Sequence, residues 1–143
     1  MFDVIICDMF LGRKLPDAFT NSDFKQINFI QAYLYALIYS DVLGQIFATP
    51  LMNHVLINMD DTIKRGKDQV KRFSVFSGHD TNIVPLLTFL NLTSADCIEK
   101  QWKNQTYSGN CAEVVPFASN IIFELHESDN SPGTHYVKVK YNG

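Results

Sequence analysis

The chain has 143 residues, 46% of them hydrophobic and 19% charged, with a net charge of -3 and a pI near 5.7. This size fits one ordinary domain or part of a larger one, and the composition supports a packed core rather than wholesale disorder. The net negative charge indicates no basic surface of the kind that binds nucleic acid, so we expect no nucleic-acid partner. No apolar run is long enough to span a bilayer, and the sequence lacks a phosphate-binding loop, a dinucleotide fingerprint and zinc-type cysteine spacing.

The first third of the chain predicts mainly helices. The apolar stretch FDVIIC (residues 2–7) is interpreted as a strand or buried segment, and without a basic leading region or small-residue cleavage site it does not resemble a signal peptide. Apolar residues at helical spacing over 24–38 predict a largely buried helix, and Thr20 with Asp23 resembles a capping box at its start.

Residues 44–64 predict another helix or a helix pair. Two alternatives remain open for Pro50. It either sits in the first turn of a new helix that Thr49 caps, or it kinks one long helix. The charged stretch that follows, residues 64–71, is interpreted as a solvated connection.

The second half of the chain predicts an α/β arrangement. The run RFSVFS (72–77) has the aromatic and β-branched content of a buried, central parallel strand. Residues 81–92 predict a helix with Pro85 near its first turn. A loop is expected over 93–116. Two strands, SNIIFELHE (119–127) and HYVKVKY (135–141), should then form a hairpin. This order of elements indicates a layered α/β domain.

Cysteine and asparagine patterns bear on the compartment. Cys97 and Cys111 bracket a polar loop and are candidates for a disulfide, which would contribute about 3 kcal/mol in the chain-entropy model. Two glycosylation sequons begin at Asn91 and Asn104, which makes both asparagines candidate glycan acceptors. Together these features predict the secretory pathway, with a lysosomal or extracellular destination.

The pair His79-Asp80 stands where the predicted strand turns into a helix. Ligands of open α/β sheets bind outside the carboxyl ends of strands, and a helix N-terminus favours an anion. A protonated His79 would face the same anion, and a protonated Asp80 would supply the proton that a leaving alkoxide requires. In the alternative reading, Asp80 only caps the following helix and His79 is a hydrogen-bonded residue at a strand end.

The wider pattern around this pair favours the first reading. The segments SGHDTNI (77–83), PFASNIIFELHE (116–127) and HYVKVKYNG (135–143) resemble the C-terminal part of the histidine acid phosphatase family, within the phosphoglycerate-mutase-like superfamily. The resemblance covers nearly the whole chain. It implies an α/β fold that is part of a three-layer αβα phosphoglycerate-mutase-like architecture, with part of the helical cap and a C-terminal β-hairpin.

The resemblance also implies a chemistry. In this family a histidine of an Arg-His-Gly motif attacks phosphorus, a phosphohistidine forms, and water hydrolyses it. By position, His79 would bind the phosphate and Asp80 would be the proton donor to the leaving oxygen. The substrate would be a phosphate monoester, and no metal or other cofactor is implied.

Several features depart from the family pattern. The chain has no Arg-His-Gly, and none of the other histidines is followed by glycine. His54 lies in an apolar helical run and is interpreted as structural, whereas His126 and His135 are expected on the surface or across the hairpin. Asn120 stands where relatives often carry a cysteine that pairs near Cys7, so Cys7 is expected to be unpaired.

We therefore interpret residues 1–143 as the C-terminal portion of a histidine acid phosphatase domain whose N-terminal half, with the nucleophile, is absent from this sequence. Alone, the chain should have little or no activity. The alternative is a non-catalytic phosphate-binding or interaction module that kept the fold and lost the nucleophile. A homodimer of the longer parent remains an open alternative.

Overall fold

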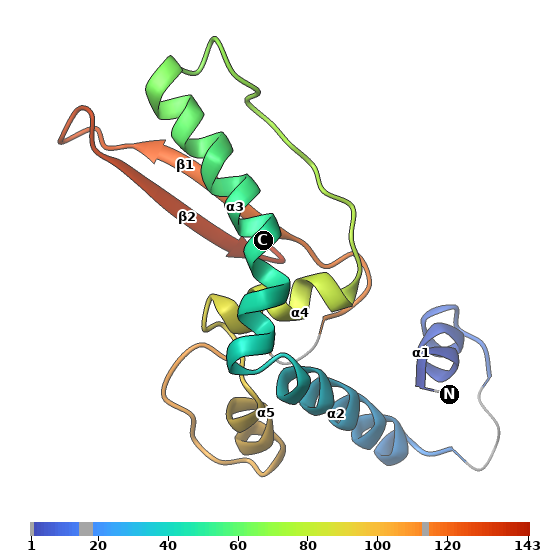
Figure 1. Ribbon diagram of the computed structural model, residues 1–143. Coiled ribbons are helices and arrows are strands. Elements are labelled where there is room, and N and C mark those ends of the chain that lie inside the picture. Colours follow the sequence, from blue (N-terminus) through green and yellow to red (C-terminus); the bar gives the residue numbers. More distant parts are fainter. Residues whose placement is uncertain (1, 15–18, 113–114) are drawn as a thin grey trace.

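A computed structural model describes residues 2–14, 19–112 and 115–143. Within these residues, helices come first and a two-stranded antiparallel sheet comes last (Figure 1). The helices are α1 (Phe2–Phe10), α2 (Asn21–Ile38), α3 (Asp41–Arg65), α4 (Asp80–Phe89) and α5 (Ala95–Trp102), and the strands are β1 (Ile121–Glu127) and β2 (His135–Tyr141). The predicted mixed α/β class is confirmed.

Helix α2 begins at the predicted capping box. Thr20 Oγ1 accepts the Asp23 N–H at 3.2 Å, and Asp23 Oδ2 accepts the Thr20 N–H at 2.8 Å. The Thr20 hydroxyl also donates to Asp23 Oδ2 at 2.7 Å. This bond, and then the bond from the Thr20 N–H, lower the pKa of Asp23, because both favour the charged carboxylate. The prediction of a largely buried helix is wrong, since Ala36 is the α2 residue that is buried and Leu34 and Leu37 are exposed.

Helix α3 is one continuous helix with Pro50 in its interior, so Pro50 does not begin a new helix. Thr49 is no cap, because its hydroxyl donates to the carbonyl of Gln45 at 2.5 Å. Pro50 lacks an N–H and leaves the carbonyl of Ile46 without its usual helical donor. Among the described helices none is by itself long and apolar enough to cross a membrane; α2 together with residues 42–65 reaches that length only as a pair bent by 81°.

Three local predictions are wrong. Residues 2–7 are helical, residues 72–77 carry no strand, and the expected loop 93–116 contains α5. For residues 72–77 the reason is that a strand needs a hydrogen-bonding neighbour, and the two described strands pair with each other instead. Phe73 and Val75 are consequently 82% and 74% exposed.

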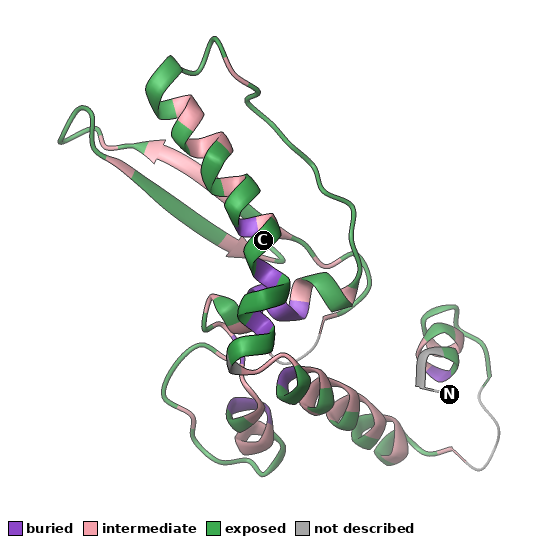
Figure 2. Cartoon of the chain, in the orientation of Figure 1, coloured by how far each residue is buried: buried purple, intermediate pink, exposed green. Residues whose placement is uncertain are grey.

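Among the described residues, the apolar core includes two small clusters (Figure 2). In the first, Ala36 of α2 packs against Cys97 and Ile98 of α5. In the second, residues of α3 and α4 pack together beneath β1; its members are Ala48, Met52 and Leu86, with Leu51, Ile121 and Phe123 against them. The accessible surface is 10117 Å², whereas a compact protein of this mass would expose about 7,500 Å². Much apolar surface therefore has no partner among the described residues.

The junction of α2, α3 and α4 depends on Gly44. A Cβ at this position would lie 2.3 Å from the backbone oxygen of Tyr39 and 2.7 Å from Thr88 Oγ1. Only glycine allows this approach, so Gly44 fixes how closely α3 packs on α4.

The C-terminal hairpin is confirmed, with Ile121 opposite Tyr141 and Glu127 opposite His135. Side chains alternate between its two faces. One face is mainly apolar and includes Phe123 opposite Val139. The other is mainly polar and includes Glu124, whose carboxylate accepts from Lys140 Nζ at 2.6 Å.

Candidate functional site

The candidate site lies at the N-terminus of α4. Residues 73–79 run without regular secondary structure from the far end of α3 to this point (Figure 1). His79 is the N-cap residue with extended dihedral angles, φ -121° and ψ 173°, and Asp80 is the first helical residue. His79 is exposed and Asp80 is half-buried, so both side chains lie at the surface rather than in the apolar core.

Asn82 holds the backbone at this helix start. Its side-chain Oδ1 accepts the N–H of His79 at 2.9 Å. Gly78 lies close beside it: a Cβ on Gly78 would approach Asn82 Oδ1 to 3.1 Å, so a larger residue there would have to displace the Asn82 side chain by a small amount. We did not predict this contact from the sequence, although the three-residue spacing from His79 to Asn82 is that of a capping box.

The carboxylate of Asp80 is engaged locally. Its Oδ1 accepts the N–H of Thr81 at 2.7 Å. The helix cap itself belongs to His79. The reading of Asp80 as the N-cap residue is therefore wrong in position, although its carboxylate does bind one of the N–H groups at the helix end.

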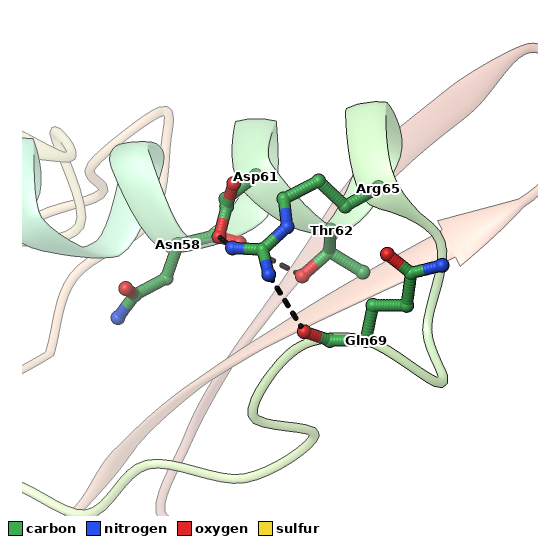
Figure 3. Close-up of polar contacts among 5 residues, drawn as sticks. All are labelled: Asn58, Asp61, Thr62, Arg65 and Gln69. Atoms are coloured by element: carbon green, nitrogen blue, oxygen red, sulfur yellow. Dashed lines mark hydrogen bonds and ion pairs between the residues drawn. The ribbon is translucent and has the colours of Figure 1, made fainter.

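The arginines do not gather at this helix start. The sequence has three, Arg13, Arg65 and Arg72, and each pairs with an aspartate four or five residues away: Asp8, Asp61 and Asp68, respectively. Figure 3 shows Arg65, whose guanidinium lies 3.1 Å from Asp61 and donates to the carbonyl of Gln69 at 3.3 Å. These pairs are exposed and local, so they do not form a clamp for a phosphoryl group around His79.

The remaining histidines lie apart from α4 in the chain. The ring of His54 on α3 contacts Phe76 edge-on, with centroids 5.4 Å apart, and the side chain is exposed. His126 stacks on its cross-strand partner Tyr136 at 5.2 Å, and His135 Nδ1 lies 3.2 Å from the carbonyl of Gly133. The cross-strand position predicted for His126 and His135 is confirmed. In the described part of the chain, no group of three or more histidine, cysteine or acidic residues is arranged to hold a metal.

The cysteine prediction is confirmed. Cys97 and Cys111 form a disulfide that joins α5 to the loop behind it, and Cys7 is free and exposed. The two sequon asparagines, Asn91 and Asn104, are exposed. Each directly follows the C-cap residue of a helix and has a positive φ, 55° and 54°.

Comparison with known proteins assigns these features to a family. The sequence model described as the histidine phosphatase superfamily (branch 2) matches residues 2–142. The venom acid phosphatase Acph-1 of Apis mellifera is 26% identical over 144 residues, which are 99% of this chain and 32% of that protein. The 2-phosphoxylose phosphatase 1 proteins of Homo sapiens and Xenopus tropicalis are 27% and 29% identical over 67% and 66% of this chain.

The chain spans only part of the length of these relatives. It covers about a third of the venom phosphatase, and it covers 16% and 15% of the two 2-phosphoxylose phosphatases. No solved structure matches the chain significantly.

Proposed function

Because the chain belongs to the histidine phosphatase superfamily (branch 2), we propose that it is the C-terminal portion of an acid phosphatase that hydrolyses phosphate monoesters. The observation that carries this proposal is the placement of His79 and Asp80 at the start of α4, at the surface and next to each other. A helix N-terminus with an imidazolium beside it suits a phosphoryl group, and a neighbouring carboxylic acid suits its leaving oxygen.

In the proposed reaction, a histidine from outside this chain attacks phosphorus and forms an N–P bond while the P–O bond to the alcohol breaks. Asp80 gives its proton to the departing alkoxide. His79 holds a phosphoryl oxygen during this step. Water then attacks the phosphohistidine, releases phosphate and restores the free histidine.

Proton donation by Asp80 is tested by Asp80→Asn in the longer protein. We expect kcat/KM for an alkyl phosphate to fall by about 10²- to 10⁴-fold, because an alkoxide is a poor leaving group without a proton. The loss should be much smaller for p-nitrophenyl phosphate, whose leaving group needs little protonation. A purely structural role would lower both rates equally, and that result would refute the assignment.

Asp96 provides the matched control. It is also an aspartate in the first turn of a helix, α5, and it pairs with Lys100 at 2.8 Å. Asp96→Asn makes the same chemical change at an exposed pair, so activity on both substrates should stay within about twofold of the unchanged protein.

The 143 residues alone should have little or no phosphatase activity, since removing a covalent nucleophile lowers the catalytic rate by several orders of magnitude.

A non-catalytic phosphate-binding or interaction module is the second candidate. The local pairing of all three arginines favours it. The upstream reading frame separates the two: an in-frame Arg-His-Gly supports the enzyme, and a start codon without that motif supports the module.

We also propose a place in the secretory pathway, lysosomal or extracellular. The Cys97–Cys111 disulfide supports it, because such bonds persist in oxidising compartments. The match to a phosphatase of venom points in the same direction. Localisation of the tagged protein tests it, and a purely cytosolic distribution would refute it.

A further inference from the structure

The two sequons, which have the same pattern in the sequence, have different surroundings in the fold. Both asparagines end a helix in the same way. Leu92 N–H reaches back to the carbonyl of Leu87 at 2.8 Å behind Asn91, and Gln105 N–H reaches back to Lys100 at 2.8 Å behind Asn104. Asparagine is suited to this left-handed position whether or not it carries a glycan. The difference therefore lies in the third residue of each sequon.

Thr93, the third residue of the Asn91 sequon, is buried. Its hydroxyl donates to the carbonyl of Ala112 at 2.6 Å and lies 3.7 Å from Cys97 Sγ. The backbone of Leu92 is also tied to this loop, since its carbonyl accepts from Ala112 N–H at 2.8 Å. This sequon is therefore folded against the disulfide, and its hydroxyl is occupied.

The Asn104 sequon is open along its whole length. Asn104, Gln105 and Thr106 are all exposed, and they lie in the polar loop that the Cys97–Cys111 disulfide closes. Acceptor recognition requires both the asparagine amide and the hydroxyl two residues later. Here both groups stay accessible even after α5 and the disulfide have formed.

We propose that Asn104 is the N-glycosylated residue of this region and that Asn91 acts as an unmodified helix-ending residue. The donor would be a lipid-linked oligosaccharide diphosphate. The Asn104 Nδ2–C1 bond forms as the C1–O bond to the diphosphate breaks, and the amide proton passes to a base of the transferase. The proposal rests on the proposed compartment but does not depend on the phosphate chemistry.

A glycan at Asn104 would cover an apolar feature. Trp102, two residues earlier, is 43% exposed and stacks on Phe29 with centroids 4.6 Å apart. Bulky, hydrophilic carbohydrate near this surface would increase solubility.

The test expresses the longer protein that contains these 143 residues, behind a cleavable signal peptide, in a eukaryotic secretory host. The mass of the peptides that carry Asn91 and Asn104 is compared before and after endoglycosidase treatment. In these peptides we expect one N-linked glycan that Asn104→Gln and Thr106→Ala both remove and Asn91→Gln leaves in place. Asn110→Gln is the matched control, because Asn110 is exposed in the same loop but is followed by Cys111 and Ala112 and forms no sequon.

In these peptides, a glycan that survives Asn104→Gln, a second glycan that Asn91→Gln removes, or no glycan after secretion would each overturn the proposal. The signal peptide imposes the route, so these results test the site itself. The native compartment is tested separately by localisation of the unmodified gene product.

Discussion

The first core cluster, in which Ala36 packs against Cys97 and Ile98, and the extended segment 72–79 both contain several apolar residues. The apolar side chains are buried in the cluster and exposed in the segment. In the cluster, α2 and α5 pack together and Cys97 is 0% exposed. In the extended segment, Phe73 is 82% exposed. A helix forms its own backbone hydrogen bonds and needs only a side-chain partner, whereas a strand needs a neighbouring strand as well. Apolar patterning thus shows which residues require burial but does not supply their partner.

The largest expected effect concerns the whole chain in isolation. Its exposed apolar surface should prevent a single sharp unfolding transition. The chain should also bind a dye such as ANS, which reports exposed apolar groups. Amide protection should be highest in α2, α4 and α5 and lower in the hairpin and the remaining segments. Calorimetry measures the unfolding transition and hydrogen exchange measures the protection. A single cooperative transition with uniform amide protection would contradict the predicted difference between the two regions.

Leu87→Ala and Phe73→Ala sharpen the same contrast at single residues. Leu87 is 1% exposed, so its truncation should lower the opening free energy of α4 by about 3 kcal/mol. Phe73→Ala should change it by less than about 0.5 kcal/mol in the isolated chain. Native-state hydrogen exchange measures both values. Equal effects of the two substitutions would contradict the assignment of core and surface.

Replacing both Cys97 and Cys111 with alanine tests the covalent contribution. The disulfide spans a sequence separation of 14, so its loss should lower the opening free energy of α5 by about 3 kcal/mol. Exchange in the hairpin should not change, because its contacts lie elsewhere. A matched loss of protection in β1 and β2 would show that the two regions form one cooperative unit.

The smallest effect concerns the polar face of the hairpin. Hydrogen bonds from Lys140 and then from His126 hold the pKa of Glu124 below its ordinary value of 4.5. Because folding lowers this pKa, the stabilisation is present above the unfolded value and is lost as the pH falls through the folded value.

Lys140→Gln should therefore reduce hairpin protection at about pH 5 and have little effect at about pH 2, where the carboxylate is protonated. Lys138→Gln leaves the Lys140 contact intact and should matter less at both pH values. A pH-independent effect of Lys140→Gln would mean that packing of the lysine stem, rather than the ion pair, supports the strands.

Local signals predicted much of the fold. The capping box at Thr20, the helical pattern over residues 44–64 and the hairpin over residues 121–141 all depend on neighbours close in sequence. The strand predicted at 72–77 was wrong because strand formation needs partners far along the chain. The helix at residues 2–7 was missed because a short apolar run fits either structure.

The site was partly predictable. The position of His79 and Asp80 at a helix start follows from the glycine before them and the helical run behind them. The contact between Asn82 Oδ1 and the His79 N–H was not predicted, although its spacing was visible. No periodic pattern shows that Thr93 is buried against the loop at Ala112, since that contact spans 19 residues.

By itself, the sequence determined helices α2, α3 and α4, the hairpin, the disulfide candidates and the family resemblance, because these depend on residue type and short spacing. Only the tertiary structure decided which apolar residues are covered, which of two equivalent sequons stays open and that every arginine is paired locally. Burial and ion pairing depend on distances in space, and the order of residues fixes those distances only after the chain has folded.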